Sequence, residues 1–450
     1  MRISALCLLA VTTAFAAPAF AQDHMDHGGM AMPMPAAPEK KPAAAPMEMP
    51  RDHGAMAMPG MHDMSAMAGA LGPYGFSREA SGTSWQPDAS PHDMGAMTMR
   101  GPWMLMGHAM LNGVYDWQDG PRGDEKAFVS GMVMGMARRD LANGDALQVR
   151  AMLSPDPFMG KSGYPLLFAS GETADGVTHL IDRQHPHDLF MELSGSYSHR
   201  LSGENSVFVY AGLPGEPAFG PPAFMHRLSA MDSPEAPISH HWLDSTHITF
   251  GVVTAGLVHG DWKIEASRFK GREPDQDRFD IEEPKLDSTS VRLSWNPTKR
   301  LALQASWADQ KSPEQLAPGV DEERWSASAI YTAPIGASGW WSTTLAVGVK
   351  KPDGEDSRTA WALESAYHPN KAWTFFGRAE RVETDELLDP GPLTDVTKAS
   401  LGVIRDFQIG KHAAFGIGAL YTHDWVPGNL DSAYGGDQDG AMGFVRLKIG

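Results

Sequence analysis

Histidine and methionine recur in short units near the N-terminus of this chain. Residues 23–35, DHMDHGGMAMPMP, contain two histidines and four methionines, and Asp/His/Met units recur as far as residue 94. Thioether sulfur is a soft ligand that suits Cu(I), whereas imidazole accepts Cu(I) or Cu(II). These units therefore predict a copper-binding segment. Its predicted ligands are His24, Met25, His27, Met30, His53, Met56, Met61, His62, Met64, His92 and Met94.

Two alternatives to copper binding stay open for this segment. Silver and mercury are soft ions and would be bound by the same ligand types. The second alternative is that the segment is a polar, methionine-biased linker without any ligand role.

A second group of soft ligands follows in a predicted strand at residues 103–117. Side chains alternate between the two faces of a strand, so one face carries Met104, Met106, His108 and Met110, and the other is apolar. Two further strands place Met132, Met134, Met136 and Met152 in phase with polar residues. We expect these side chains to form a thioether patch on the inner wall of a barrel. The alternative is that the methionines serve as adaptable apolar packing.

Histidine and aspartate form a third group, in two long predicted loops that enter strands separated by one hairpin. We expect the group to converge as a Cu(II), Zn or Ni site, or as a hydrogen-bond network that pins the loops. A third alternative is a hydrolase, in which Ser239 or Ser245 would act beside a histidine. The residues of the group are His185, His187, Asp188, His240, His241, Asp244 and His247.

The N-terminal hundred residues divide into two segments. Arg2, an apolar run at 3–17 and the small-residue site Ala19-Phe20-Ala21 predict a signal peptide over residues 1–21. Residues 22–100 hold fourteen of the 27 methionines and almost no branched aliphatic residues, so we expect a disordered Met/His-rich tail. The single cysteine, Cys7, lies in the signal peptide.

Net charge and hydropathy restrict the partners. The formal charge of −18 argues against nucleic acid and is compatible with metal ions. No apolar stretch after the signal peptide approaches the roughly 20 residues of a membrane helix. If the chain contacts a membrane, it does so through strands.

Residues 101–450 show the period-2 alternation of strands, separated by connections that alternate between short and long. This pattern predicts an all-β fold, an antiparallel transmembrane barrel of about 16 strands with both termini on the short-turn, periplasmic side. A soluble β-sandwich is the alternative, and the non-aromatic C-terminus, Lys448-Ile449-Gly450, departs from the usual barrel ending. The sixteen predicted strands cover residues 103–117, 126–141, 145–154, 188–201, 204–213, 244–260, 262–271, 288–296, 300–309, 324–334, 340–351, 358–368, 372–384, 395–407, 412–424 and 439–449.

The tail followed by a predicted barrel resembles the copper-resistance protein B type of bacterial outer-membrane protein. The stretches DRQHPHDLFMELS and HHWLDSTHITFG are similar to stretches of bacterial proteins of unknown function that are associated with heavy-metal loci. The first resemblance covers the architecture and the tail, and the second covers roughly residues 77–300. Together they imply copper binding or tolerance at the outer membrane.

The predicted function is copper binding and a contribution to copper tolerance or export, without enzymatic activity. The expected partners are outer-membrane lipid, metal ions and periplasmic copper proteins, with the tail in the periplasm. A general porin or structural barrel without a metal role is the main alternative.

Overall fold

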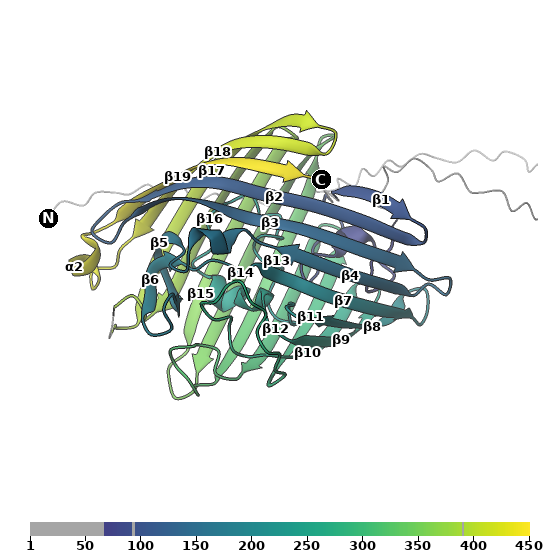
Figure 1. Ribbon diagram of the computed structural model, residues 1–450, viewed down its shortest axis with the longest axis horizontal. Coiled ribbons are helices and arrows are strands. Elements are labelled where there is room, and N and C mark those ends of the chain that lie inside the picture. Colours follow the sequence, from purple (N-terminus) through teal and green to yellow (C-terminus); the bar gives the residue numbers. More distant parts are fainter. Residues whose placement is uncertain (1–66, 92–94, 389–390) are drawn as a thin grey trace, which may run out of the picture. The chain divides into compact units, whose positions relative to one another are not determined.

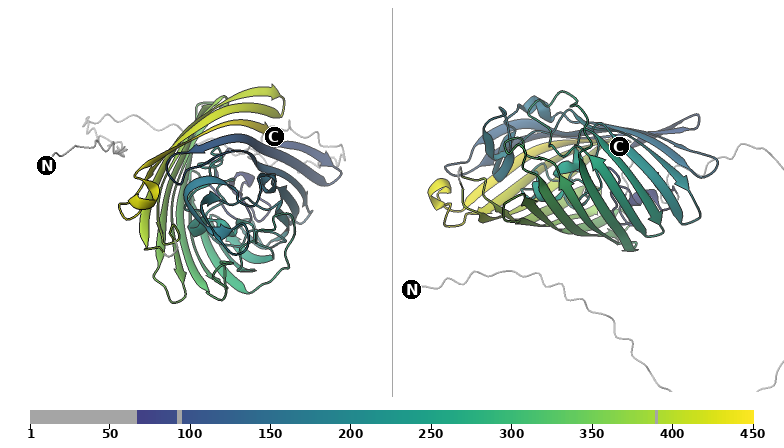
Figure 2. Two further views of the ribbon diagram at one scale, coloured as in Figure 1. Left: turned by 60° about the vertical axis from the view of Figure 1, so that its left-hand side comes forward. Right: turned by 90° about the horizontal axis from the view of Figure 1, so that it is seen from below.

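Sixteen antiparallel strands pair in chain order, and the last of them closes onto the first. The computed structural model describes residues 67–91, 95–388 and 391–450. Gly440 to Ile449 of the last strand pair with Gln118 to Ala109 of the first, and Figure 2 shows the resulting ring of strands. The barrel strands are β2 (Trp103–Gln118), β3 (Glu125–Asp140), β4 (Ala146–Leu153), β7 (Phe190–Arg200), β8 (Asn205–Gly212), β9 (Val252–His259), β10 (Trp262–Phe269), β11 (Ser288–Thr298), β12 (Leu301–Gln310), β13 (Glu322–Ile335), β14 (Gly339–Pro352), β15 (Arg358–Asn370), β16 (Trp373–Thr384), β17 (Thr394–Gly410), β18 (Ala413–Trp425) and β19 (Gln438–Ile449).

All sixteen predicted strands are present, and the alternation of short and long connections is confirmed. The largest error in a boundary is at β9, which begins at Val252 rather than at residue 244. The preceding residues form two short helices, α1 (His240–Leu243) and η4 (Ser245–His247). Three strands were not predicted, namely β1 (Ala96–Arg100) and the hairpin of β5 (Tyr164–Thr173) and β6 (His179–Gln184). The remaining helices are η2 (Phe76–Arg78), η3 (Asp156–Met159) and α2 (Asp431–Tyr434).

The barrel is apolar outside and charged inside. Leu345, Trp361 and Leu363 are exposed on the outer face, whereas Glu364 and Arg378 are buried in the lumen. Two girdles of exposed aromatic residues lie near the strand ends, represented by Trp262, Trp295, Tyr331, Trp341, Tyr367 and Trp373 at the short-turn rim, and by Tyr115, Trp117, Trp325, Trp361, Tyr421 and Trp425 at the other. An exterior of this kind requires lipid, as in outer-membrane barrels. Among the described residues, no helix has the length and apolar content to span a bilayer.

Strand β1 and the last strand, β19, pair with the same edge of β2. β19 pairs with residues 109–118 of β2, and β1 pairs with residues 103–107 of the same strand. Figure 1 shows the C-terminus beside β1, where a Cβ added to Gly450 would lie 2.7 Å from the Cα of Gly95. The two strands therefore share the edge of β2 in succession, and a larger C-terminal side chain would collide at their junction.

Residues 67–91 fall within the predicted disordered tail, but they are ordered within the barrel. Trp85 packs edge-on against Tyr74, with ring centroids 4.9 Å apart. Ser198 and Ser206 of the wall donate hydrogen bonds to the carbonyl oxygens of Ala70 and Leu71, at 2.7 and 2.8 Å. The composition of the whole tail conceals the aromatic and aliphatic residues that this short segment buries.

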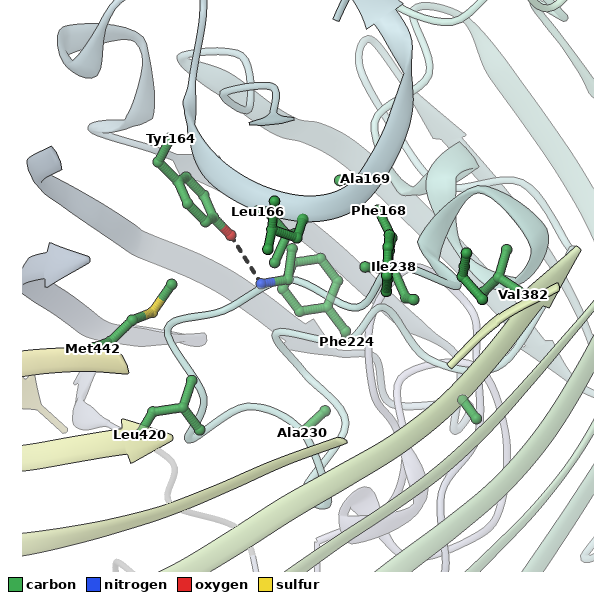
Figure 3. Close-up of a cluster of buried hydrophobic side chains, with 14 of the residues drawn as sticks. Tyr164, Leu166, Phe168, Ala169, Phe224, Ala230, Ile238, Val382, Leu420 and Met442 are labelled. Atoms are coloured by element: carbon green, nitrogen blue, oxygen red, sulfur yellow. Dashed lines mark hydrogen bonds between the residues drawn. The ribbon is translucent and has the colours of Figure 1, made fainter. Parts of the chain in front are cut away.

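The long loops also fold inward. Almost all side chains of residues 214–251 are buried, as expected for a stiff, proline-rich loop. Figure 3 shows Phe224 and Ile238 of this loop beside Leu166 and Phe168 of the β5–β6 hairpin. The Tyr164 hydroxyl accepts a hydrogen bond from the Ala236 amide at 2.9 Å. The lumen is therefore a packed interior built from both ends of the barrel.

Candidate metal sites in the lumen

The predicted thioether patch lines the lumen in the register that the alternation predicts. Met106 lies opposite Met136, His108 opposite Met134, and Met110 opposite Met132 across β2 and β3. Met134 lies in turn opposite Met152 of β4. Met104, Met106, Met110, Met132, Met136 and Met152 are all buried. We call the set Met104, Met106, His108, Met110, Met132, Met134, Met136 and Met152 the thioether wall.

A loop residue joins the thioether wall from across the lumen. Nε2 of His226, in the loop between β8 and β9, lies 3.3 Å from Sδ of Met152. Met225 and Met231 of the same loop pack against Met110 and Met152. Sequence reasoning missed these residues as ligands, although the Met225-His226 pair carries the same ligand types as the wall.

A cavity of about 440 Å³ lies against the thioether wall. Its lining includes Met106, Met134 and His226, together with Asn370 and Lys411 at the short turns. Met67, the first described residue, packs with Met104 and Met106 at the edge of the wall. The predicted ligands His24, Met25, His27, Met30, His53, Met56, Met61, His62, Met64, His92 and Met94 lie outside the described residues.

The predicted histidine cluster does converge. The ring centroid of His247 lies 5.1 Å from that of His240 and 5.3 Å from that of His187. His241 lies 5.6 Å from His240 and 5.7 Å from His185 by the same measure. The segment between β6 and β7 and the 214–251 loop supply these rings, as their positions on one rim predicted. We call these five residues the histidine cluster.

Three rings of the cluster are held through Nδ1. Nδ1 of His187 lies 2.7 Å from Oδ2 of Asp156, and Nδ1 of His240 lies 2.7 Å from Oδ1 of Asp244. Nδ1 of His247 lies 2.7 Å from the carbonyl oxygen of Asp244. A carbonyl or an ionised carboxylate only accepts, so Nδ1 carries the proton. Nε2 of His187 and of His247 are buried without a hydrogen-bond partner. A metal-binding histidine usually donates its other ring N–H to an acceptor of this kind, which fixes the tautomer.

The electrostatics favour the neutral imidazole in three of the five rings, whereas Glu273 raises the pKa of His241 against the effect of burial. Burial lowers the pKa of His185, His240 and His247 below the usual value, because the charged ring is poorly solvated there. The neutral ring is the form that ligates metals.

The two aspartates of the predicted site do not face the cluster as free ligands. Asp244 accepts hydrogen bonds from Arg227 at 2.9 Å and from His240. Asp188 accepts one from Arg278 at 3.2 Å. Both carboxylates therefore neutralise arginines or orient rings, and Asp156 is an orienting residue that sequence reasoning missed.

The hydrolase hypothesis finds no support at its two serines. The Ser239 hydroxyl donates to Glu380 at 2.6 Å, and the Ser245 hydroxyl donates to Glu273 at 3.0 Å. Neither hydroxyl is bonded to an imidazole, so the nucleophile and base of that hypothesis are not paired.

Comparison with known proteins identifies the class of fold. No protein-family model matches the chain, and no curated protein matches its sequence. Among solved structures, OmpF of Salmonella typhi in complex with daunomycin gives a TM-score of 0.51 at 10% identity, covering 79% of this chain and 100% of OmpF. The anion-selective porin from Comamonas acidovorans gives 0.45 at 11% identity, covering 77% of this chain and 100% of the porin. OprB of Pseudomonas putida gives a TM-score of 0.47 at 9% identity, covering 77% of this chain and 94% of OprB.

At these identities the likeness concerns the fold alone, and the OmpF match agrees with the strand pairing described above. The chain is a closed sixteen-stranded barrel of the outer-membrane type. Its ligand groups are properties of this sequence and have to be interpreted from its own geometry.

Proposed function

We propose that this outer-membrane barrel binds copper through the thioether wall and contributes to copper tolerance or export. The observation that carries the proposal is the row of facing soft ligands, Met106 with Met136 and His108 with Met134, along a 440 Å³ cavity. Thioether and imidazole together suit Cu(I). His226 adds a second imidazole from the opposite side of the cavity.

The N-terminal tail extends this proposal to the periplasm. The cavity and Met67 both lie at the short-turn end of the barrel. In barrels of this type the short turns face the periplasm. A tail ligand set preceding Met67 would deliver ions to the wall or pass them to periplasmic copper proteins. Copper is a cargo in this proposal.

The filled lumen argues against a general porin. Residues 67–91 pack inside the short-turn end, and residues 214–251 pack inside the barrel from the other end. A general porin instead needs a wide aqueous passage.

The proposal is tested by replacing the wall methionines in the full chain. The triple variant Met106→Leu, Met134→Leu, Met136→Leu removes sulfur while nearly conserving volume, so it should cost less than about 1.5 kcal/mol per site. We expect it to bind fewer Cu(I) equivalents than the wild type in a titration against a chromogenic Cu(I) chelator.

The matched control is Met442→Leu, because Met442 on β19 is buried like the wall residues but lies opposite Asp116, outside the wall. It should titrate like the wild type. Equal Cu(I) stoichiometry in the triple variant and the wild type would remove the wall from the mechanism.

A further inference from the structure

Three loops at the long-loop end bring a histidine and two glutamates together. His241 belongs to the 214–251 loop, Glu273 to the loop after β10, and Glu314 to the loop after β12. One ligand atom from each lies within 4.8 Å of those from the other two. His241 Nδ1 and Glu273 Oε2 are 3.5 Å apart.

Two of these ligand atoms are buried without a hydrogen bond. His241 is 6% exposed and Glu273 is 8% exposed, and neither Nδ1 of the first nor Oε2 of the second has a hydrogen-bond partner. A buried polar atom left in this way costs about 1–3 kcal/mol. The atoms face one another at a distance that an ion between them would satisfy.

The charges around the three residues do not balance. Arg278 pairs with Glu172 and with Asp188, the latter at 3.2 Å. Lys350 lies 3.2 Å from Glu314 and 3.8 Å from Glu322, and Arg324 pairs with Glu322 and lies 3.3 Å from Glu273. The carboxylates of this group therefore outnumber its arginine and lysine side chains, and a bound cation would offset part of the negative charge.

A small space adjoins the two glutamates of the group. A cavity of about 10 Å³ is lined by Glu172, Glu273 and Glu314, which is close to the volume of one water-sized occupant. Gly171 lines it with φ +124°, and a Cβ there would lie 3.2 Å from Cε1 of His241. A side chain at residue 171 would therefore press on the ring.

We infer that His241, Glu273 and Glu314 form a binding site for a divalent cation, which ties the three loops together across the long-loop end of the lumen. One imidazole and two carboxylates are a ligand set of Zn²⁺ type. The set contains no sulfur, so it does not favour Cu(I). The site is separate from the thioether wall and independent of the proposed copper function.

The site is tested in the full chain, purified in detergent and freed of metal with a chelator. Titration with Zn²⁺ should show about one equivalent fewer in Glu273→Gln and in Glu314→Gln than in the wild type. Glu283→Gln is the matched control, because Glu283 is exposed in the same loop as Glu273. The control should bind as much Zn²⁺ as the wild type.

Folding of each variant is checked by the shift in gel mobility between unheated and heated samples. Glu314→Gln is the milder substitution, because Glu314 is only partly buried. Cu(I) stoichiometry should be the same in all these variants. Zn²⁺ also should slow proteolysis of the 311–321 loop in the wild type and not in Glu314→Gln. Equal Zn²⁺ stoichiometry in all folded variants would overturn the inference.

Discussion

The two ends of the lumen hold different ligand chemistry on one scaffold. At the short-turn end the thioether wall offers neutral sulfur from the strands, and His226 reaches it from a loop. At the long-loop end imidazoles and carboxylates come from loops and the β5–β6 hairpin, and buried arginines such as Arg227 and Arg278 hold them. The first end suits a soft monovalent ion and the second a divalent ion.

The two ends are in contact, so the difference is not one of separate domains. Met191, Ile248 and Phe250 pack with Met110 and Met152 of the wall. His187 and His247 of the histidine cluster lie within four residues of Met191 and Phe250 along the chain. A soft-ligand region and a charged region therefore adjoin inside the barrel, and each can be perturbed separately.

The largest expected effect comes from removing the arginine that holds the charged end. Arg227 is 1% exposed and pairs with Glu364 at 2.6 Å and Asp244 at 2.9 Å. Arg227→Met leaves two buried carboxylates without their partner, which should cost about 3–5 kcal/mol. We expect a lower unfolding temperature and, because the 214–251 loop loses its anchor, a higher single-channel conductance in planar bilayers.

The control for this experiment is Arg381→Met, which breaks the exposed pair of Arg381 with Asp395. It should leave both measurements unchanged, since exposed ion pairs contribute little. If Arg227→Met matches the wild type in both unfolding temperature and conductance, Arg227 does not anchor the 214–251 loop.

A smaller effect, on metal content rather than stability, is expected from the N-terminal segment. Deletion of residues 23–66 keeps the predicted signal peptide and Met67, and removes most of the Asp/His/Met units. Cu(I) stoichiometry should fall, while the heat-dependent gel shift of the barrel stays. A second variant keeps the full length and replaces four histidines by Asn, namely His24, His27, His53 and His62. It shows whether an effect of the deletion comes from the lost ligands or from the shorter chain. Unchanged stoichiometry in the deletion would exclude the tail from copper binding.

The smallest effect concerns the attachment of residues 67–91. Ser206→Ala removes the hydrogen bond to the Leu71 carbonyl, which should cost about 1 kcal/mol. Hydrogen exchange of residues 67–76 should become several-fold faster, and exchange elsewhere should not change. Ser202→Ala in an exposed turn is the control. Equal exchange in both variants would show that the segment is held by other contacts.

The sequence predicts the strands and the thioether wall for one physical reason. Side chains in a strand alternate with period two, so Met104, Met106 and His108 had to share a face, and the polar residues beside them marked it as the inner one. Alternating loop lengths gave the closed topology in the same way.

The rest depends on contacts between distant parts of the chain. Residues 67–91 form a short segment of a polar, methionine-rich region, and the composition of that whole region conceals the aromatic residues that the segment buries. Glu273 and Glu314 are single glutamates in separate loops, and nothing in their spacing indicates that they meet His241. The histidine cluster was predicted because the loop positions place its members on one rim. Asp156, which orients His187, lies 31 residues earlier in the same connection, and its spacing gives no sign of that contact.

X-ray absorption spectroscopy of the full chain loaded with one equivalent of Cu(I) tests the central claim most directly. Our account predicts sulfur in the first coordination shell together with imidazole nitrogen. It also predicts a loss of sulfur scattering in the Met106→Leu, Met134→Leu, Met136→Leu variant that exceeds any change in Met442→Leu. A wild-type spectrum with nitrogen and oxygen ligands alone would contradict it.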